Sequence, residues 1–242
     1  MVRALAPIVM VLLAAPALAA DPGLFTCRVI VTGTDLRTRP EALERCIRRV
    51  VVKVTGRPSL EDDPRTAAIA RHGEALIEDL VYLDRMSDVP HHDEQGTRDR
   101  PYDLIAHVAP ERLGQELTKA GLRPWLERPK LVAHIQVTPK DGAGFVLDAD
   151  GDAGERQRQA LLAAADRFGL RVALPTGAQA QSGVAPDGVP LEGELAWSDA
   201  DFGWNAAWRL GGDGARWEVR GVSFDEAYRA GLGGAAERLA AR

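Results

Sequence analysis

The segment from Thr38 to Gly56 places the strongest constraint on the fold of this chain. Its apolar residues recur at steps of three and four, which aligns them along one side of an α-helix. They are Leu43, Cys46, Ile47, Val50, Val51 and Val54. Thr38 and Glu41 have the spacing of a capping box, and Gly56 stands where a C-terminal cap is expected. We therefore predict an amphipathic helix whose apolar side packs on a sheet that contains Val29.

Basic residues occupy the other side of this predicted helix. They are Arg45, Arg48, Arg49 and Lys53. The favoured interpretation is an ordinary solvent-exposed face, because surface charge is the normal state of such faces. The alternative is a face that contacts acidic lipid headgroups or an acidic partner.

The first residues have the features of an export signal. Arg3 gives a positive start, Ile8 to Leu13 an apolar run, and Ala17 to Ala19 a small-residue cleavage site. The apolar run is too short for a membrane span, and no later stretch approaches the roughly 20 apolar residues that a span needs. We therefore expect residues 1–20 to be a signal peptide, and the mature protein to be periplasmic, soluble and without a transmembrane segment.

The charge balance argues against nucleic acid as a partner. The chain has 30 Lys and Arg residues against 35 Asp and Glu residues, a formal net charge of −5. Nucleic-acid-binding domains usually carry a strongly basic surface instead.

Two cysteines, Cys27 and Cys46, suggest one disulfide, since an exported protein meets an oxidising compartment. Cys27 alternates with Val29 and Val31 along an expected strand, and Cys46 lies on the apolar side of the following helix. Both should therefore face the same layer. Two buried thiols that behave as small apolar residues are the alternative.

Two prolines between Arg123 and Pro129 mark the best boundary, because they restrict the preceding residues to extended conformations. We expect a signal peptide (1–20), an N-terminal αβ module (21–122), a linker (123–130) and a C-terminal αβ module (131–242). The expected fold class is α+β, in which each module is a mostly antiparallel sheet with helices packed on one face.

The patterns predict these elements in chain order. In the first module they are a strand at 24–32, helices at 38–56 and 63–80, a hairpin of strands 81–89 and 102–109, and a helix at 110–121. In the second module they are strands at 131–138, 144–147 and 171–175, a helix at 155–168, a loop over 177–190, an antiparallel meander of 191–198, 202–210 and 215–221, and a helix at 223–241.

Three segments together resemble one family. They are Phe25 to Gly56 with Asp63-Pro64 soon after, Gly121 to Pro129, and the Trp-rich strand before the closing helix. They are similar to the exported bacterial family called DUF2066, a domain of unknown function. The resemblance implies an envelope protein without an assigned reaction, and it transfers no catalytic residue.

His91, His92 and Asp93 form the densest group of potential metal ligands. Imidazole and carboxylate are ligands for zinc or a related ion. Neighbouring residues on a strand or loop point apart, so a metal would need a further ligand, such as His107 or Asp103. A solvated hairpin tip is the favoured interpretation, and a metal site is the alternative.

The acidic run from Asp148 to Asp152 is similar to the start of a calcium loop. The pattern then fails, because Ala153 stands in place of the glycine and Gln159 in place of the final glutamate. Turns and a helix cap explain these carboxylates without calcium. We expect no cofactor.

The sequence offers no recognisable catalytic motif. No serine lies in a G-x-S-x-G elbow, and Gly231 to Gly234 lack the strand that a dinucleotide fingerprint requires. The favoured interpretation is that these glycines allow a helix to pack closely against its neighbours. A triad formed in space from His72, His107 or His134 is left open. No catalytic residue is therefore assigned.

Five tryptophans stand out beside three tyrosines and five phenylalanines. We expect Trp204 and Trp208 in the core, on one face of a strand with Phe202, and Trp125 near the linker is the interface candidate. The expected function is a noncatalytic binding or assembly module of the cell envelope, with an envelope protein as partner. A metal-assisted hydrolase that uses His91, His92 and Asp93 is the alternative, and recognition of a small polar ligand between the modules is a third.

Overall fold

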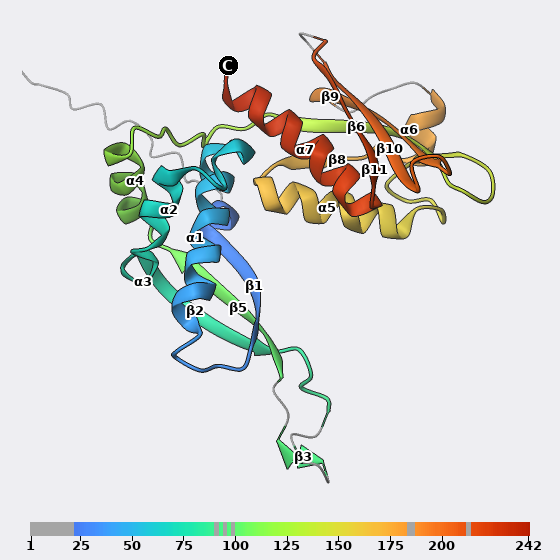
Figure 1. The fold of residues 1–242 in the computed structure, drawn as a ribbon. Helices are drawn as coiled ribbons and strands as arrows, with labels where there is room; N and C mark the ends of the chain where they lie inside the picture. The colour runs from blue at the N-terminus through green and yellow to red at the C-terminus, as the bar shows by residue number, and fades with distance from the viewer. Residues whose placement is uncertain (1–21, 90–91, 94–95, 98–99, 183–186, 212–213) are drawn as a thin grey trace, which may run out of the picture.

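The structure, a computed structural model, describes residues 22–242 except 90–91, 94–95, 98–99, 183–186 and 212–213. The expected signal peptide lies outside the described residues. Two sheets, each with its own helices, confirm the α+β fold class (Figure 1). In the described part of the chain, no helix combines the length and the apolar character needed to cross a membrane.

The first sheet is antiparallel, with strand order β1-β5-β2. Its strands are β1 (Thr26–Thr32), β2 (Ile77–Asp84) and β5 (Pro101–Val108). A separate short pair, β3 (His92–Asp93) and β4 (Gly96–Thr97), lies in the connection between β2 and β5. The helical elements around the sheet are η1 (Pro22–Phe25), α1 (Arg39–Thr55), η2 (Pro58–Leu60), α2 (Pro64–Ala70), α3 (Gly73–Leu76) and α4 (Pro110–Lys119).

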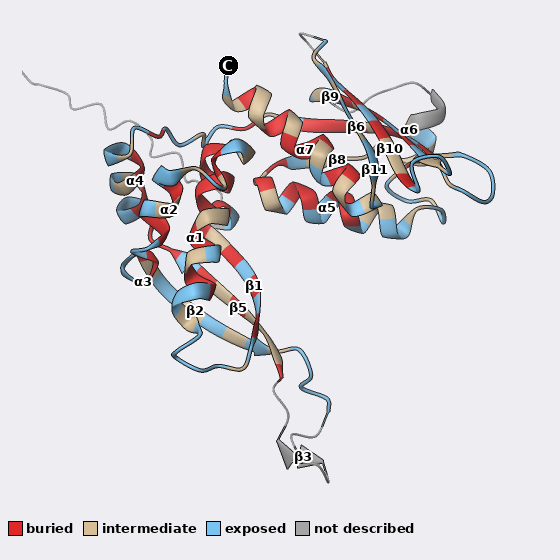
Figure 2. Cartoon of the chain, in the orientation of Figure 1, coloured by how far each residue is buried: buried red, intermediate tan, exposed pale blue. Residues whose placement is uncertain are grey.

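The apolar side of α1 is buried against this sheet, as predicted. Ile47 and Val50 are fully excluded from solvent in a core that also contains Val29 and Leu104 (Figure 2). Gly56 ends the helix in the left-handed conformation at φ 67°, where its N–H donates to a helix carbonyl.

The predicted capping box does not form. The backbone of Thr38 is helical rather than extended, so its hydroxyl is turned away from the first free N–H groups of α1. It donates instead to the carbonyl of Asp35.

The predicted helix over 63–80 forms as two shorter helices, α2 and α3, and the prediction is wrong beyond Leu76. Asp63 does cap α2, since its carboxylate accepts from the backbone N–H of Arg65. Ile77 and Leu80 have helical spacing with the residues before them, but they belong to β2, where Leu80 is the partner of Ala106. Pairing with β5 therefore overrides the local pattern.

The second sheet has strand order β11-β10-β9-β6-β7, and β8 also pairs with β6. The strands are β6 (Lys130–Thr138), β7 (Phe145–Leu147), β8 (Arg171–Ala173), β9 (Val189–Ser198), β10 (Gly203–Leu210) and β11 (Arg216–Val222). The predicted meander of β9, β10 and β11 is antiparallel, whereas β6 runs parallel to β8 and β9. Helices α5 (Glu155–Phe168) and α7 (Phe224–Ala240) pack against each other (Figure 1).

The predicted loop over 177–190 also needs correction. It contains α6 (Gly177–Ser182) and the first two residues of β9. The carboxylate of Asp150 accepts from the N–H of Gly177 at 2.8 Å, and Val189 pairs with Leu131 of β6. Both contacts join segments far apart in the sequence, so local composition could not indicate them.

On the aromatic face of β10, Trp208 is buried in the second core, and Trp204 is half-buried and packs against it. Phe202 is not part of that face. It lies in the turn before β10 with φ 51°, and 88% of its surface is exposed.

Candidate functional site: the groove between the two modules

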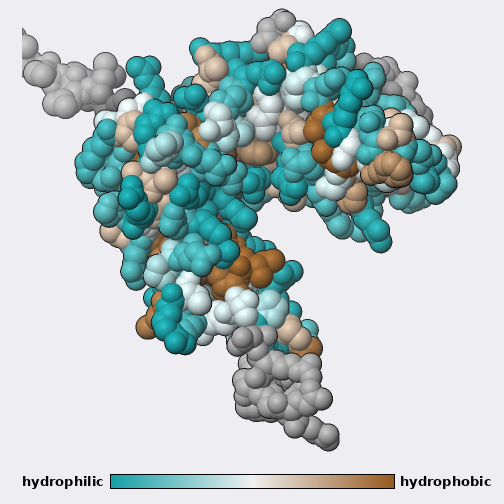
Figure 3. All heavy atoms as spheres, in the orientation of Figure 1, coloured by the Kyte–Doolittle hydropathy of each residue, from teal (hydrophilic) through white to brown (hydrophobic). Residues whose placement is uncertain are grey.

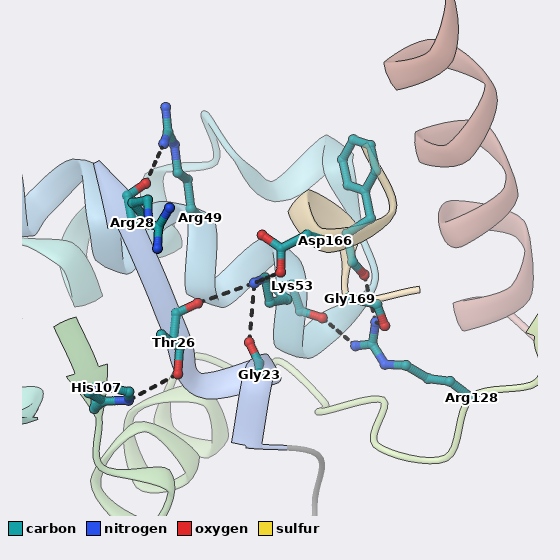
Figure 4. A network of polar contacts seen from close by, with 10 residues as sticks. Gly23, Thr26, Arg28, Arg49, Lys53, His107, Arg128, Asp166 and Gly169 are labelled. Carbon is teal, nitrogen blue, oxygen red and sulfur yellow. Dashed lines mark hydrogen bonds and ion pairs between the residues drawn. The ribbon is translucent and has the colours of Figure 1, made fainter. Parts of the chain in front are cut away.

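Arg128 connects the two modules. It lies between the linker prolines Pro124 and Pro129, and only 6% of it is exposed. The guanidinium donates to the carbonyls of Lys53 near the end of α1 and of Phe168 and Gly169 at the end of α5 (Figure 4). Cations are stabilised by the free carbonyls at helix C-termini. One arginine therefore caps a helix from each module.

Trp125, the predicted interface residue, lies at this same junction. Its backbone N–H donates to the carbonyl of Val54 at 2.8 Å, and the guanidinium of Arg128 lies 4.5 Å from its ring centroid. A side chain at Gly56 would overlap the indole ring, so glycine is required there twice over, for its φ and for this contact. Contact between Trp125 and another protein stays a prediction.

Lys53 is the second link between the modules. Only 5% of it is exposed, although the helix pattern places it on the polar side. Its ammonium donates to the carbonyls of Gly23 and Thr26 at 3.1 and 3.2 Å and pairs with the carboxylate of Asp166 on α5 at 3.2 Å (Figure 4). The favoured interpretation of a solvated face is therefore wrong for Lys53.

The free edge of β1 is partly covered by the same face of α1. Lys53 donates to the carbonyl of Thr26, and Arg49 donates to the carbonyl of Arg28 at 3.0 Å. Basic side chains that occupy edge carbonyls make pairing with another strand less favourable. This part of the edge is therefore a poor place for strand addition.

A groove of about 250 Å³ lies between β1 and α1 on one side and α5 and α7 on the other. Its charged lining residues are the basic Arg28, Arg49, Lys53, Arg167 and Arg229 and the acidic Asp166 and Asp225. The groove is thus predominantly basic, in a chain whose formal net charge is −5. This local excess of positive charge favours an anionic ligand.

Three of the five basic side chains are neutralised by neighbours. Lys53 pairs with Asp166, Arg167 pairs with Glu61 at 2.7 Å, and Arg229 pairs with Glu226 at 2.6 Å.

The other two, Arg28 and Arg49, form no ion pair with an acidic residue in the described part of the chain. The pKa of Arg49 is lowered, first by partial burial and then by the positive charge of Arg167. An anion placed beside Arg49 would relieve this repulsion.

Cys27, which lines the groove, lies at disulfide distance from Cys46. Their Cα atoms are 5.7 Å apart, within the usual range of roughly 4.4–6.8 Å. The two residues face the same layer, as their positions on β1 and α1 predict. A bridge here would fix the strand that carries Arg28 to the helix that carries Arg49.

The structure gives no side-chain position for the predicted metal ligands. His91 lies outside the described residues, and for His92 and Asp93 the structure describes only the backbone, in β3. Among the described residues, no three His, Cys, Asp or Glu side chains gather as a metal site. His107 lies 3.0 Å from the hydroxyl of Thr26 instead.

The acidic run after β7 makes one local and one long-range hydrogen bond. The carboxylate of Asp148 accepts from the N–H of Gly151 at 2.6 Å, and that of Asp150 accepts from the N–H of Gly177. The bond of Asp148 agrees with the turn interpretation, whereas that of Asp150 links the run to α6.

Comparison with known families corrects the resemblance to DUF2066. A family described as a domain of unknown function (DUF8605) matches residues 19–126, a stretch shorter than half of the chain. It is a different family from DUF2066, and the glycines, prolines and apolar positions that suggested DUF2066 are structural features that unrelated folds share. A search of curated proteins found no match. The matched stretch includes β1 and α1, so the first module, with Arg28 and Arg49, is similar to a family without an assigned activity.

Proposed function

We propose that this protein is a noncatalytic binding module of the cell envelope, and that the groove between its modules holds an anionic group. The observation that carries the proposal is the pair Arg28 and Arg49. Both side chains line the groove without an ion pair to a described acidic residue, whereas the other basic lining residues are neutralised.

The chemistry of the guanidinium group supports an oxyanion as the ligand. Its N–H donors lie in one plane and match the oxygens of phosphate, sulfate or carboxylate. Arg49 gives one N–H to the carbonyl of Arg28, which positions its planar group beside the strand. The remaining donors of Arg49 and those of Arg28 then define the oxyanion site.

The envelope location is supported by two separate features. Residues 1–20 have the composition of an export signal, and Cys27 and Cys46 lie at disulfide distance, which is typical of proteins from oxidising compartments. The intact mass of protein recovered from the periplasmic fraction tests both. We expect a chain that begins at Ala20 or Asp21 and lacks two cysteine hydrogens. A full-length, reduced chain in the cytoplasmic fraction would contradict this location.

Isothermal titration calorimetry with sn-glycerol 3-phosphate tests the anion site. Arg28→Gln and Arg49→Gln should each weaken binding at least about tenfold, because a hydrogen bond to a charged group contributes roughly 1.5–3 kcal/mol. Arg71→Gln is the matched control, since Arg71 is an exposed arginine at the end of α2, away from the groove. Equal affinities for all three variants, or no binding to the unaltered protein, would refute the proposal.

A further inference from the structure

We propose that the ligand of this groove is an amphiphile, a phosphate monoester that carries a single acyl chain. The inference rests on the proposed function. It adds a location for the acyl chain of such a ligand. The chain would lie on the outer face of the first sheet, over a surface that we call the outer apolar patch. The patch consists of Ile30 on β1, Val81 and Leu83 on β2, and Ile105 on β5.

Strand register places these four side chains on one face. Ile105 is the partner of both Arg28 and Val81, and Asp103 is the partner of both Ile30 and Leu83. Side chains alternate between the two faces of a sheet, so residues two apart, such as Arg28 and Ile30, share a face. Arg28 therefore lies next to two residues of the patch, Ile30 on its own strand and Ile105 on the neighbouring strand.

The patch faces away from the first core. The core residues of β1 and β5, such as Val29 and Leu104, lie at the alternate positions together with the apolar residues of the helices. Ile30, Val81 and Leu83 are 55%, 40% and 47% exposed. Figure 3 shows brown, apolar atoms over β1, on the side toward the recess between the modules.

A shallow hollow connects the anion site with this patch. Arg28 and Arg49 line both this hollow and the groove between the modules. The hollow continues past Ile30 and Asp103, and the carboxylate of Asp103 is 3.8 Å from the guanidinium of Arg85. An anionic head beside Arg28 thus places an attached acyl chain next to Ile30, at the edge of the patch.

The same observations favour an amphiphile over a peptide strand. Added strands bind through free backbone groups at a sheet edge, but the carbonyls of Thr26 and Arg28 already accept from Lys53 and Arg49. An acyl chain needs no backbone partner. It needs an apolar surface beside a cationic site, which this face provides. Two guanidinium groups also suit the charge of a phosphate monoester better than that of a single carboxylate.

The test compares three probes in calorimetry, with the acyl probes kept below their critical micelle concentrations. They are lauroyl lysophosphatidic acid, with head and chain, sn-glycerol 3-phosphate, with the head alone, and monolauroyl glycerol, with the chain alone. The lysophosphatidic acid should bind at least about tenfold tighter than glycerol 3-phosphate, because each buried methylene contributes about 0.8 kcal/mol.

Substitutions in the outer apolar patch test where the acyl chain binds. Ile30→Thr and Leu83→Thr keep side chains suited to a strand, and each should remove most of the gain from the chain while leaving the affinity for glycerol 3-phosphate unchanged. Val146→Thr is the control, because Val146 is 47% exposed on β7 of the other sheet. Circular dichroism checks that each variant folds, and Val81→Thr replaces either one that does not.

Each outcome separates the inference from the proposed function. Equal affinity for lysophosphatidic acid and glycerol 3-phosphate would overturn the inference and leave the anion site intact. A chain-dependent gain that the patch variants do not change would also overturn it, as would a dimer in sedimentation that Leu83→Thr dissociates. Binding of monolauroyl glycerol alone, or of no probe, would overturn both.

Discussion

At the residue scale, two buried cations hold the modules in the arrangement that creates the groove. Arg128 caps the ends of α1 and α5, and Lys53 connects β1 to Asp166. Neither role could be predicted from the sequence, because the acceptors of Lys53 lie 27 to 113 positions away. From the helical spacing, we could predict only that Lys53 lies on the side of the helix opposite the apolar residues.

Replacement of Lys53 should destabilise the whole protein. Lys53→Met keeps much of the aliphatic chain but removes the donor for two carbonyls, so we expect a loss of about 1–3 kcal/mol in the free energy of unfolding. Urea denaturation measures it. Lys119→Met, which removes an exposed ion pair with Glu116, should cost about 0.5 kcal/mol or less. Equal losses for both variants would show that the buried contacts of Lys53 do not stabilise the fold.

Asp63 provides a pH-dependent contact at the start of α2. Hydrogen bonds from the side chain and the backbone N–H of Arg65 lower the pKa of its carboxyl from 3.8 to about 2. A lowered pKa stabilises the folded state above the unfolded value, and this contribution is lost as pH falls from about 4 through 2. A carboxyl ¹³C NMR titration should give a midpoint near 2 for Asp63. A midpoint near 3.8 would mean that the cap is not formed.

At the element scale, the sequence predicted segments that end at strong local signals. Helix α5 has its predicted bounds, and the structure shows that Gly154 and Gly169, which flank it, both adopt positive φ. The helix prediction failed for residues 77–80, since they suit a helix and a strand alike, and pairing with β5 decides between the two. The glycines of α7 were correctly attributed to close packing, because Gly231 faces Trp208 and Gly234 faces Trp217.

Two glycine substitutions test that packing. Gly231→Ala would drive a methyl group into the buried ring of Trp208, and we expect a loss of about 1–3 kcal/mol in unfolding free energy. Gly114→Ala on α4 meets nothing within 4 Å, so it should raise stability by about 0.5–1 kcal/mol through helix propensity. Thermal unfolding compares the two. A stabilising Gly231→Ala would show that α7 lies farther from β10 than described.

At the scale of the whole molecule, the site arises where two folded modules meet. The sequence pattern singled out Arg49 on the basic face of α1 but neither Arg28 nor Arg167, because their convergence on the groove depends on α1 packing beside α5. These two helices are in direct contact. Val52 lies on α1 and yet belongs to the core of the second module. A groove of this kind leaves no motif in one segment. In the sequence, only the basic face of α1 indicated the groove. In the structure, part of that face lies beside acidic and basic residues of α5.

The most direct measurement observes the side chains themselves. In ¹H–¹⁵N spectra of the arginine Nε–Hε groups, addition of sn-glycerol 3-phosphate should shift the signals of Arg28 and Arg49 together, with one shared dissociation constant, and leave Arg71 unchanged. Signals of Arg28 and Arg49 that stay in place while the ligand is in excess, or shifts confined to arginines outside the groove, would contradict an anion site between the modules.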